Sequence, residues 1–306
     1  MTQTPPAFLF ASLANYIELG IGQVEGWLLP TTASVIGHLL VQQAAAGLRG
    51  DVCEIGVHHG KLFLILANAT VPGERAVAVD VFGDQDKNVD GSGSGDREIF
   101  ERHLATYSPG ASVDVIQESS LDLERLGFLS RRFRFISIDG GHTASITAND
   151  LRLAERTMLP GGIVAVDDIL SHDWTGVLSG VSAYLAGGGT LVPFALVPNK
   201  LLLTTDTAAA AQGRALMRRS FPLALSKQEL EFLGGAVDSY NEQPYYSREA
   251  NAGLRQALDD LYRQRELLAS QLSAAHAEVA NLRASTSWRV TAPLRALARL
   301  KQRAGE

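Results

Sequence analysis

Short apolar runs and segments of helical periodicity alternate along the chain from residue 51 to about residue 205. The apolar runs are the expected strands, and they cover residues 51–56, 75–81, 112–117, 133–139, 161–167, 191–197 and 200–205. Nearly continuous apolar strands separated by helices are typical of a parallel sheet that is covered on both faces. The pattern therefore predicts an α/β fold with a doubly wound, mostly parallel, seven-stranded sheet.

Helical patterns flank the expected sheet on both sides. Residues 1–50 are expected to form an N-terminal helical cap, in which 35–48 has the clearest pattern. After the last strand, two short helical patterns surround residues 208–219 and 226–235, and residues 241–246 look like a linker. We therefore assign residues 51–245 to the domain that contains the sheet.

Beyond the linker the apolar pattern changes to a period of seven. Apolar residues occupy both seam positions of a heptad repeat, with Arg265 as the exception, at Leu254, Leu258, Leu261, Leu268, Leu272, Ala275, Val279 and Leu282. Such a repeat predicts a coiled-coil helix over residues 246–285. Residues 251–283 would then hold a homo-oligomer together or bind a coiled-coil partner. The alternative is a long helix that packs back on the domain.

The last segment, residues 286–306, is basic and amphipathic. It places Trp288 and leucines between its cations, which are Arg289, Arg295, Arg299, Lys301 and Arg303. This composition suits peripheral contact with a membrane surface or an acidic partner. A solvated helix end explains it equally well.

Composition and charge limit the cellular locations and the classes of binding partner that we expect. The net charge of -6 argues against a nucleic-acid partner for the body of the protein. Cys53 is the only cysteine, which excludes a disulfide framework and fits a reducing cytoplasm. The first basic residue is Arg49, so the N-terminus lacks the positive region of a signal peptide. We expect a cytoplasmic protein, which the basic tail could bring to the inner face of the membrane.

A glycine motif follows the first expected strand. In "EIGVHHG", Gly56 and Gly60 allow tight turns and close approach of a ligand to the backbone. A dinucleotide fingerprint would have a glycine where this chain has His58, which disfavours NAD. The second expected strand ends at Asp80, where an acid can accept hydrogen bonds from ribose hydroxyls. Helix capping is the alternative role of Asp80.

Three aspartates end two further strands, at Asp139 and at Asp167 with Asp168. Ligands of such sheets bind at the carboxyl ends of the strands. Crowded carboxylates repel one another unless a cation or protons neutralise them, and an all-oxygen set favours Mg²⁺. Any one of these acids could instead cap the following helix. For all three together, we expect a metal site formed by Asp139, Asp167 and Asp168.

The motif Glu54–Gly60 resembles the first motif of class I S-adenosylmethionine-dependent methyltransferases, which have a Rossmann-like sheet. The resemblance implies that the cofactor lies against Glu54, Gly56, Gly60, Asp80, Glu118, Ser119 and Asp139. The three aspartates, with His142 three residues after the first, resemble the metal-dependent macrocin and mycinamicin type of sugar O-methyltransferases. There the corresponding acids bind Mg²⁺ and the histidine is the general base. The likeness spans roughly residues 20–205.

Residues 83–98 form a glycine-rich, acidic loop after the second expected strand. Its start, from Asp86 to Gly91, matches an EF-hand calcium loop, but the twelfth position is Arg97 instead of glutamate. We expect this loop to be a lid that binds the acceptor. Further along, Trp174 could stack on a sugar or could simply pack.

The expected function is Mg²⁺-dependent transfer of a methyl group from S-adenosylmethionine to a sugar hydroxyl of a surface glycan or glycosylated metabolite. Coordination to Mg²⁺ would lower the pKa of the hydroxyl, and His142 would remove its proton. Methylation of a phenolic small molecule is the alternative among enzymes. A non-catalytic cofactor-binding scaffold in a glycan-assembly complex is the alternative outside them.

Overall fold

The computed structural model describes residues 11–243 and the single positions 271, 274, 275, 278 and 290. The chain divides into two compact units, residues 1–246 and 247–306. The predicted coiled coil and basic tail lie almost wholly outside the described residues, so both stay predictions. Among the helices that the structure describes, none has both the length and the apolar character that a membrane span requires.

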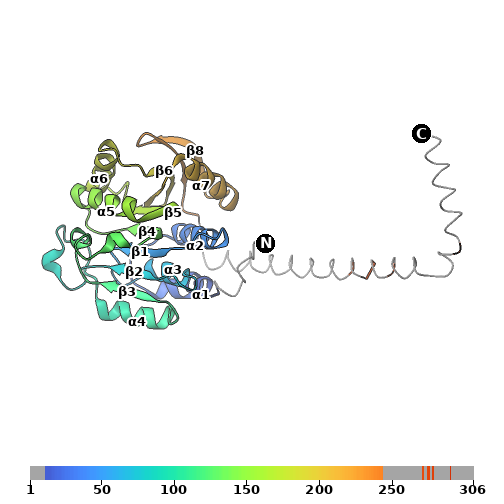
Figure 1. The fold of residues 1–306 in the computed structure, drawn as a ribbon, viewed down its shortest axis with the longest axis horizontal. Coiled ribbons are helices and arrows are strands. Elements are labelled where there is room, and N and C mark those ends of the chain that lie inside the picture. The colour runs from blue at the N-terminus through green and yellow to red at the C-terminus, as the bar shows by residue number, and fades with distance from the viewer. Residues whose placement is uncertain (1–10, 244–270, 272–273, 276–277, 279–289, 291–306) are drawn as a thin grey trace. The chain divides into compact units, whose positions relative to one another are not determined.

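One mixed sheet forms the centre of the first unit (Figure 1). Its strand order is β3-β2-β1-β4-β5-β7-β6-β9-β8. The strands are β1 Asp51–Ile55, β2 Ala76–Val79, β3 Val113–Ile116, β4 Phe133–Ile138, β5 Met158–Asp167, β6 Val192–Val197, β7 Lys200–Thr204, β8 Leu225–Phe232 and β9 Gly235–Tyr240. β1 to β5 are parallel, and β7 runs antiparallel to both β5 and β6. The predicted α/β class and all seven predicted strands are confirmed.

Helices cover both faces of this sheet, as Figure 1 shows. They are α1 Ala11–Asn15, α2 Pro30–Ala45, α3 Phe63–Asn68, α4 Arg97–Tyr107, α5 Ala144–Thr157, α6 Thr175–Ala186 and α7 Thr207–Ser220. Alternate residues of a strand point to opposite faces. Ala76 and Ala78 of β2 therefore join the hydrophobic cluster with α2, α3 and α7, whereas Val77 and Val79 join the cluster with α5 and α6. The apolar runs of the sequence reflect this burial on both faces.

The sheet is wider than predicted, because β8 and β9 add a hairpin beside β6. The prediction of a helical pattern over residues 226–235 is wrong, since β8 covers most of that range. Glu229, Leu233 and Gly234 adopt positive φ angles of 53°, 51° and 75°, which a helix does not allow. β8 is an exposed edge strand with lysine and glutamate side chains. Because neither of its faces is buried, apolar and polar residues do not alternate along its sequence.

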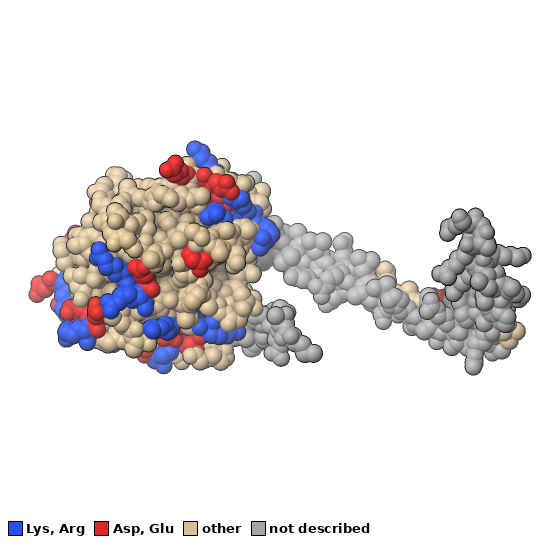
Figure 2. Space-filling model, turned by 45° about the horizontal axis from the view of Figure 1, so that its top comes forward, with Lys and Arg blue, Asp and Glu red and all other residues tan. Residues whose placement is uncertain are grey.

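Acidic and basic side chains are interspersed on the face of the molecule shown in Figure 2. On that face they do not gather into one basic surface of the kind that tracks a phosphate backbone.

A buried ion pair ties β4 to the segment before β2. The Arg134 side chain is fully buried, and its Nε and Nη2 donate to the two carboxylate oxygens of Glu74 at 3.0 and 2.8 Å. Removing one partner of a buried pair leaves an uncompensated charge, so Glu74→Ala should lower the free energy of unfolding by about 3–5 kcal/mol. Chemical denaturation measures this change. The control is Glu101→Ala, which breaks the half-exposed pair with Arg97 and should cost about 0–1 kcal/mol. Equal losses in both variants would contradict the expectation.

Candidate active site

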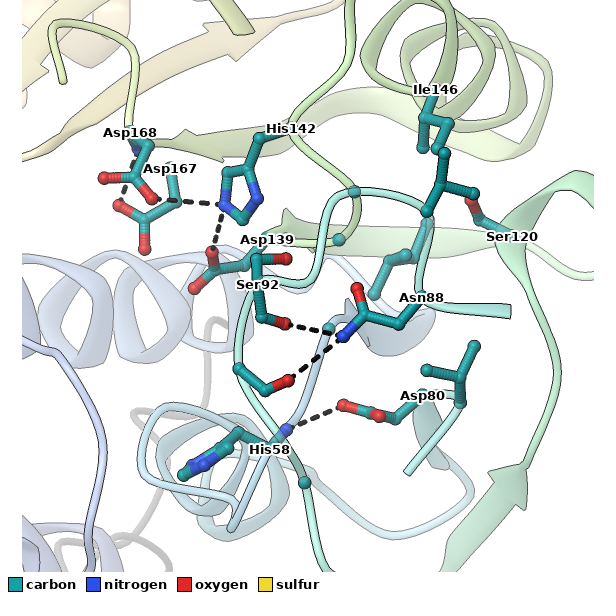
Figure 3. A pocket seen from close by; sticks show the side chains of 18 of the residues that line it. His58, Asp80, Asn88, Ser92, Ser120, Asp139, His142, Ile146, Asp167 and Asp168 are labelled. Carbon is teal, nitrogen blue, oxygen red and sulfur yellow. Dashed lines mark hydrogen bonds and ion pairs between the residues drawn. The ribbon is translucent and has the colours of Figure 1, made fainter. Parts of the chain in front are cut away.

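A cavity of about 470 Å³ opens at the carboxyl ends of the parallel strands. Its lining comes from the glycine loop after β1 and from the loops that follow β2, β3, β4 and β5 (Figure 3). The volume lies in the range of small-molecule sites. The lining has two halves, one beside the glycine loop and one beside the aspartates.

The glycine loop approaches the end of β4 so closely that it excludes a side chain. Gly56 has φ +86°, and a Cβ atom there would lie 1.8 Å from the carbonyl oxygen of Asp139. Gly60 has φ +93°, and its Cβ would meet the ring of Phe100 at 2.9 Å. His58, between them, has φ +52°, which is uncommon for a residue with a side chain. Both glycines are therefore required by the backbone, as the motif predicted.

Asp80 fixes the glycine loop from the end of β2. Its Oδ2 accepts hydrogen bonds from the backbone N–H groups of Val57 and His58 at 2.6 and 2.7 Å. Its Oδ1 accepts from the N–H of Phe82 at 2.6 Å. The carboxylate lines the cavity and keeps spare acceptor capacity on Oδ1, which accepts one hydrogen bond. The structure thus gives Asp80 a backbone-holding contact in addition to a position where it could accept from a ligand.

Glu118 and Ser119 follow β3 and also line the cavity. Glu118 Oε2 accepts from Lys87 Nζ at 2.9 Å, and Ser119 Oγ accepts from the N–H of Leu121 at 3.3 Å. Glu54 is 2 % exposed within β1 and is not among the residues that line the cavity. Burial raises its pKa well above the usual range, which favours the neutral acid. Glu54 is therefore set apart from the other residues of the expected cofactor set.

The second half of the cavity brings Asp139, His142 and Asp168 together. One ligand atom from each lies within 4.8 Å of those of the other two. His142 Nε2 is 3.2 Å from Asp168 Oδ2 and 3.9 Å from Asp139 Oδ1 (Figure 3). Asp168 reaches this position with φ +55°, a left-handed conformation that is uncommon for residues with a side chain. Two carboxylates that converge in this way beside an imidazole offer oxygen ligands for a divalent cation.

Asp167 takes part in a different set of contacts. Its Oδ1 accepts from the N–H of Asp168 at 2.9 Å and from Asn199 Nδ2 at 2.8 Å. Its Oδ2 accepts from the Lys200 ammonium. All three predicted metal ligands, Asp139, Asp167 and Asp168, line the cavity. The set with ligand atoms within 4.8 Å of one another includes His142 with Asp139 and Asp168, so the set of three aspartates stays a prediction. Lys200 faces Asp167 because the antiparallel register of β5 and β7 pairs these two residues, and the sequence did not reveal this register.

Both ring nitrogens of His142 face carboxylates. Nδ1 lies 3.2 Å from Asp90 Oδ2, and the backbone N–H of His142 donates to the same oxygen. The Trp174 ring stacks on the imidazole with a centroid distance of 4.3 Å. Burial lowers the pKa of His142, but the hydrogen bond with Asp168 and the charge of Asp90 outweigh burial, so the pKa lies above its usual value. Sequence reasoning missed Asp90 as a partner of His142.

Asp90 belongs to the loop between β2 and α4, which was predicted to be a lid. The loop lines the cavity from Gln85 to Gly95. It contacts the glycine end of the cavity through Lys87 and Glu118, and the aspartate end through Asp90 and His142. Its expected role as a lid is consistent with this position, and motion of the loop stays a prediction.

Part of this chain is similar to a family model and to several solved structures. Residues 53–169 match a family model described as a methyltransferase domain. No curated protein matches the chain. Among solved structures, the O-methyltransferase NovP is 14 % identical, with 57 % of this chain and 79 % of that chain covered and a TM-score of 0.47. The TDP-rhamnose 3'-O-methyltransferase CalS11 of calicheamicin biosynthesis is 15 % identical, with 62 % and 85 % covered and a TM-score of 0.42.

A third solved structure is the O-methyltransferase from Bacillus cereus in complex with SAH, which is 16 % identical, covers 66 % of this chain and 93 % of that chain, and has a TM-score of 0.44. Because these identities and TM-scores are low, the similarity to methyltransferases rests on the matched domain model and on the motifs within it. Gly56, Gly60, Asp80, Asp139 and His142 all fall inside residues 53–169. The predicted resemblance to methyltransferases is confirmed over residues 53–169, which match this methyltransferase domain model.

Proposed function

We propose that this methyltransferase uses S-adenosylmethionine and transfers the methyl group to a sugar hydroxyl of a glycan or glycosylated metabolite. The observation that carries the proposal is the position of His142. It lies between Asp90 and Asp168, beside Asp139, in the same cavity as the glycine loop. A base next to a cation site and a cofactor loop is what transfer to a weakly acidic hydroxyl requires.

The glycine half of the cavity would hold the cofactor. The loop from Gly56 to Gly60 offers backbone approach, Asp80 offers acceptors for ribose hydroxyls, and Glu118 with Ser119 would face the adenine end. The methyl donor would then lie toward Asp139, whose carbonyl oxygen contacts the glycine loop. Placing donor and acceptor in one cavity supplies the proximity on which methyl transfer depends.

Asp139 and Asp168 would hold Mg²⁺, since carboxylate oxygens are the protein ligands that this ion prefers. When bound, the ion lowers the pKa of a coordinated hydroxyl and fixes its position.

The remaining steps belong to the side chains of this chain. Asp90 accepts a hydrogen bond from Nδ1–H of His142 and thereby leaves Nε2, which faces Asp139 and Asp168, as the nitrogen that gains or loses a proton. Nε2 then takes the proton of the acceptor hydroxyl as the oxygen attacks the methyl group. Trp174 covers one face of the imidazole, which limits access of water.

An exposed aromatic ring at the edge of the cavity supports a sugar acceptor. One face of the Trp174 ring is covered by His142. Trp27 also lines the cavity and is 76 % exposed, with its ring 5.4 Å from that of His58. A flat, exposed indole can cover the apolar face of a sugar ring and leave the hydroxyls free for polar contacts.

The test is methyl transfer by the full-length chain to matched acceptors. The protein, S-adenosylmethionine and Mg²⁺ are incubated with nucleotide-linked sugars, with oligosaccharides and with simple phenols, and products are read by mass spectrometry. We expect methylated sugar, loss of turnover in EDTA and recovery with added Mg²⁺. Methylation of the phenols alone would overturn the sugar acceptor, and full turnover in EDTA would overturn the role of the metal.

A further inference from the structure

We infer that Asp150, a buried acid behind the wall of the cavity, sets the direction of the Ser120 hydroxyl and thereby controls how tightly the glycine half of the cavity binds the cofactor. The inference rests on the proposed use of S-adenosylmethionine. It adds a positioning residue that does not line the cavity, and it makes the affinity for the cofactor depend on pH.

Asp150 is a fully buried acid of α5 whose two oxygens have different surroundings. Its Oδ1 accepts from Asn149 Nδ2 at 3.0 Å, whereas its Oδ2 has no hydrogen-bond partner among the described residues. In the part of the chain that the structure describes, no lysine or arginine forms an ion pair with it. An ionised carboxylate is costly in such surroundings, so burial favours the neutral acid.

Three residues of the cavity lining lie next to this acid. A Cβ atom at Gly140 would lie 3.5 Å from Asp150 Oδ2, and Gly140 lines the cavity after β4. Ser120, which lines the cavity after β3, interacts with the Asp150 carboxyl through its hydroxyl (Figure 3). Ile146 lines the cavity one turn before Asp150 on α5. Asp150 therefore lies behind the part of the lining that would face the adenine end of the cofactor.

The protonation state of Asp150 decides which group donates between it and Ser120. A neutral acid has one O–H donor, and because Oδ1 accepts from Asn149, Oδ2 is the oxygen that can carry the proton and donate it to Ser120 Oγ. The single proton of the Ser120 hydroxyl is then free to be donated into the cavity. An ionised carboxylate only accepts, so the Ser120 hydroxyl turns its proton to Asp150 and the cavity loses a donor. Adenine offers ring nitrogens that accept hydrogen bonds, so the neutral acid favours its binding.

This change falls near neutral pH. Burial raises the pKa of Asp150 to about 7, although hydrogen bonding with Ser120 and Asn149 opposes the rise, and no charged side chain on the described elements around α5 contributes. Cys53 of β1 is the titratable group that senses Asp150, and burial raises the pKa of its thiol, which stays protonated. In the glycine half, burial lowers the pKa of His58. Since Asp150 is neutral below its pKa, affinity for the cofactor should fall as pH rises through about 7.

Calorimetric titration of the full-length protein with S-adenosylhomocysteine between about pH 6 and about pH 8 tests the inference. This ligand has no sulfonium charge, so attraction between an ionised acid and a cation does not enter. The affinity of the wild type should fall by at least about threefold, and by about tenfold if only the neutral form of a group with a pKa of about 7 binds. Asp150→Asn has an uncharged N–H donor in place of the acid and should lack this fall. The contribution of His58 is the same in both proteins.

Two further variants test the path and the specificity of the effect. Ser120→Ala keeps Asp150 but removes the hydroxyl, so it should bind more weakly than the wild type at about pH 6 and should also lack the fall. Asp122→Asn makes the same chemical change as Asp150→Asn, on the short 3₁₀ helix that begins at Ser120. Its side chain is partly exposed and pairs with Arg125, so this control should keep the wild-type affinity and pH dependence.

The outcomes separate the inference from the proposed function. An affinity of the wild type that is constant over this pH range, or a fall that persists in Asp150→Asn or in Ser120→Ala, overturns the inference and leaves the proposed function standing. If S-adenosylhomocysteine does not bind at any pH, the proposed cofactor is wrong and the inference is overturned with it. If binding follows the expected pattern but no sugar is methylated, the acceptor class is wrong and the role of Asp150 stands.

Discussion

Replacement of His142 by alanine should lower kcat by about 10²–10⁴-fold, the range in which a positioned general base contributes. Affinity for S-adenosylmethionine should stay close to wild type, because His142 lies in the aspartate half of the cavity, away from Asp80 and the glycine loop. Steady-state kinetics and calorimetry measure the two quantities. The control is His172→Ala, whose imidazole is 94 % exposed and which should retain activity.

The pH dependence gives an independent readout of the same role. The base must be neutral to accept a proton, so activity should rise with pH through the pKa of His142. Burial lowers that pKa, but Asp168 and Asp90 raise it to a net value above that of an ordinary histidine. At low Mg²⁺, the acidic limb of the pH profile of kcat/KM should therefore lie at higher pH than is usual for histidine. Saturating Mg²⁺ should move this limb to lower pH, because the ion neutralises Asp168. A variant His142→Ala that keeps wild-type kcat and the same limb would exclude His142 as the base.

Replacement of Asp90 by asparagine should lower kcat by about 10²–10⁴-fold, since the corresponding change behind the histidine of a serine protease costs about 10⁴-fold. The carboxylate accepts from Nδ1 of His142, which leaves the Nε2 lone pair free. An asparagine amide can donate to Nδ1, which favours the tautomer with its proton on Nε2 and removes the base. Affinity for the cofactor should change little.

The control for Asp90 comes from the same loop. Asp86→Asn makes the same chemical change at an exposed position and should leave kcat close to wild type. Asp90→Glu keeps the carboxylate and should recover part of the activity lost in Asp90→Asn. Equal losses in Asp90→Asn and Asp90→Glu would show that Asp90 acts through loop structure, and an unchanged kcat in both would remove it from the site.

The parts of the fold that the sequence predicted share one property, which is that they depend on local pattern. The strands from β1 to β7 are apolar because both faces of the sheet are buried, and the sequence shows this burial as runs of consecutive apolar residues. The glycine loop was recognisable because only glycine fits at position 56, where a Cβ atom would lie 1.8 Å from a carbonyl oxygen. Asp139 and His142 are three residues apart and come together within one turn.

The parts that the sequence did not predict depend on contacts between distant residues. Lys200 meets Asp167 only because β7 runs antiparallel to β5, and direction and register are set by tertiary pairing. Asp90 reaches His142 across 52 residues of sequence, from a loop that was predicted to be a lid without any assigned partner for Asp90. β8 lies at the edge of the sheet with one neighbour, so its sequence carries the charges of a surface segment instead of the apolar period of a buried strand.

The loop between β2 and α4 has a consequence for the order of events in a catalytic cycle. One segment of about ten residues pairs with Glu118 through Lys87 and with His142 through Asp90, so it contacts both ends of the cavity. We therefore expect a ligand that changes the loop at one end of the cavity to change the affinity for a ligand at the other end. By thermodynamic linkage, the effect would be equal in both directions. Binding of the proposed donor and acceptor, measured separately and together, is expected to be coupled.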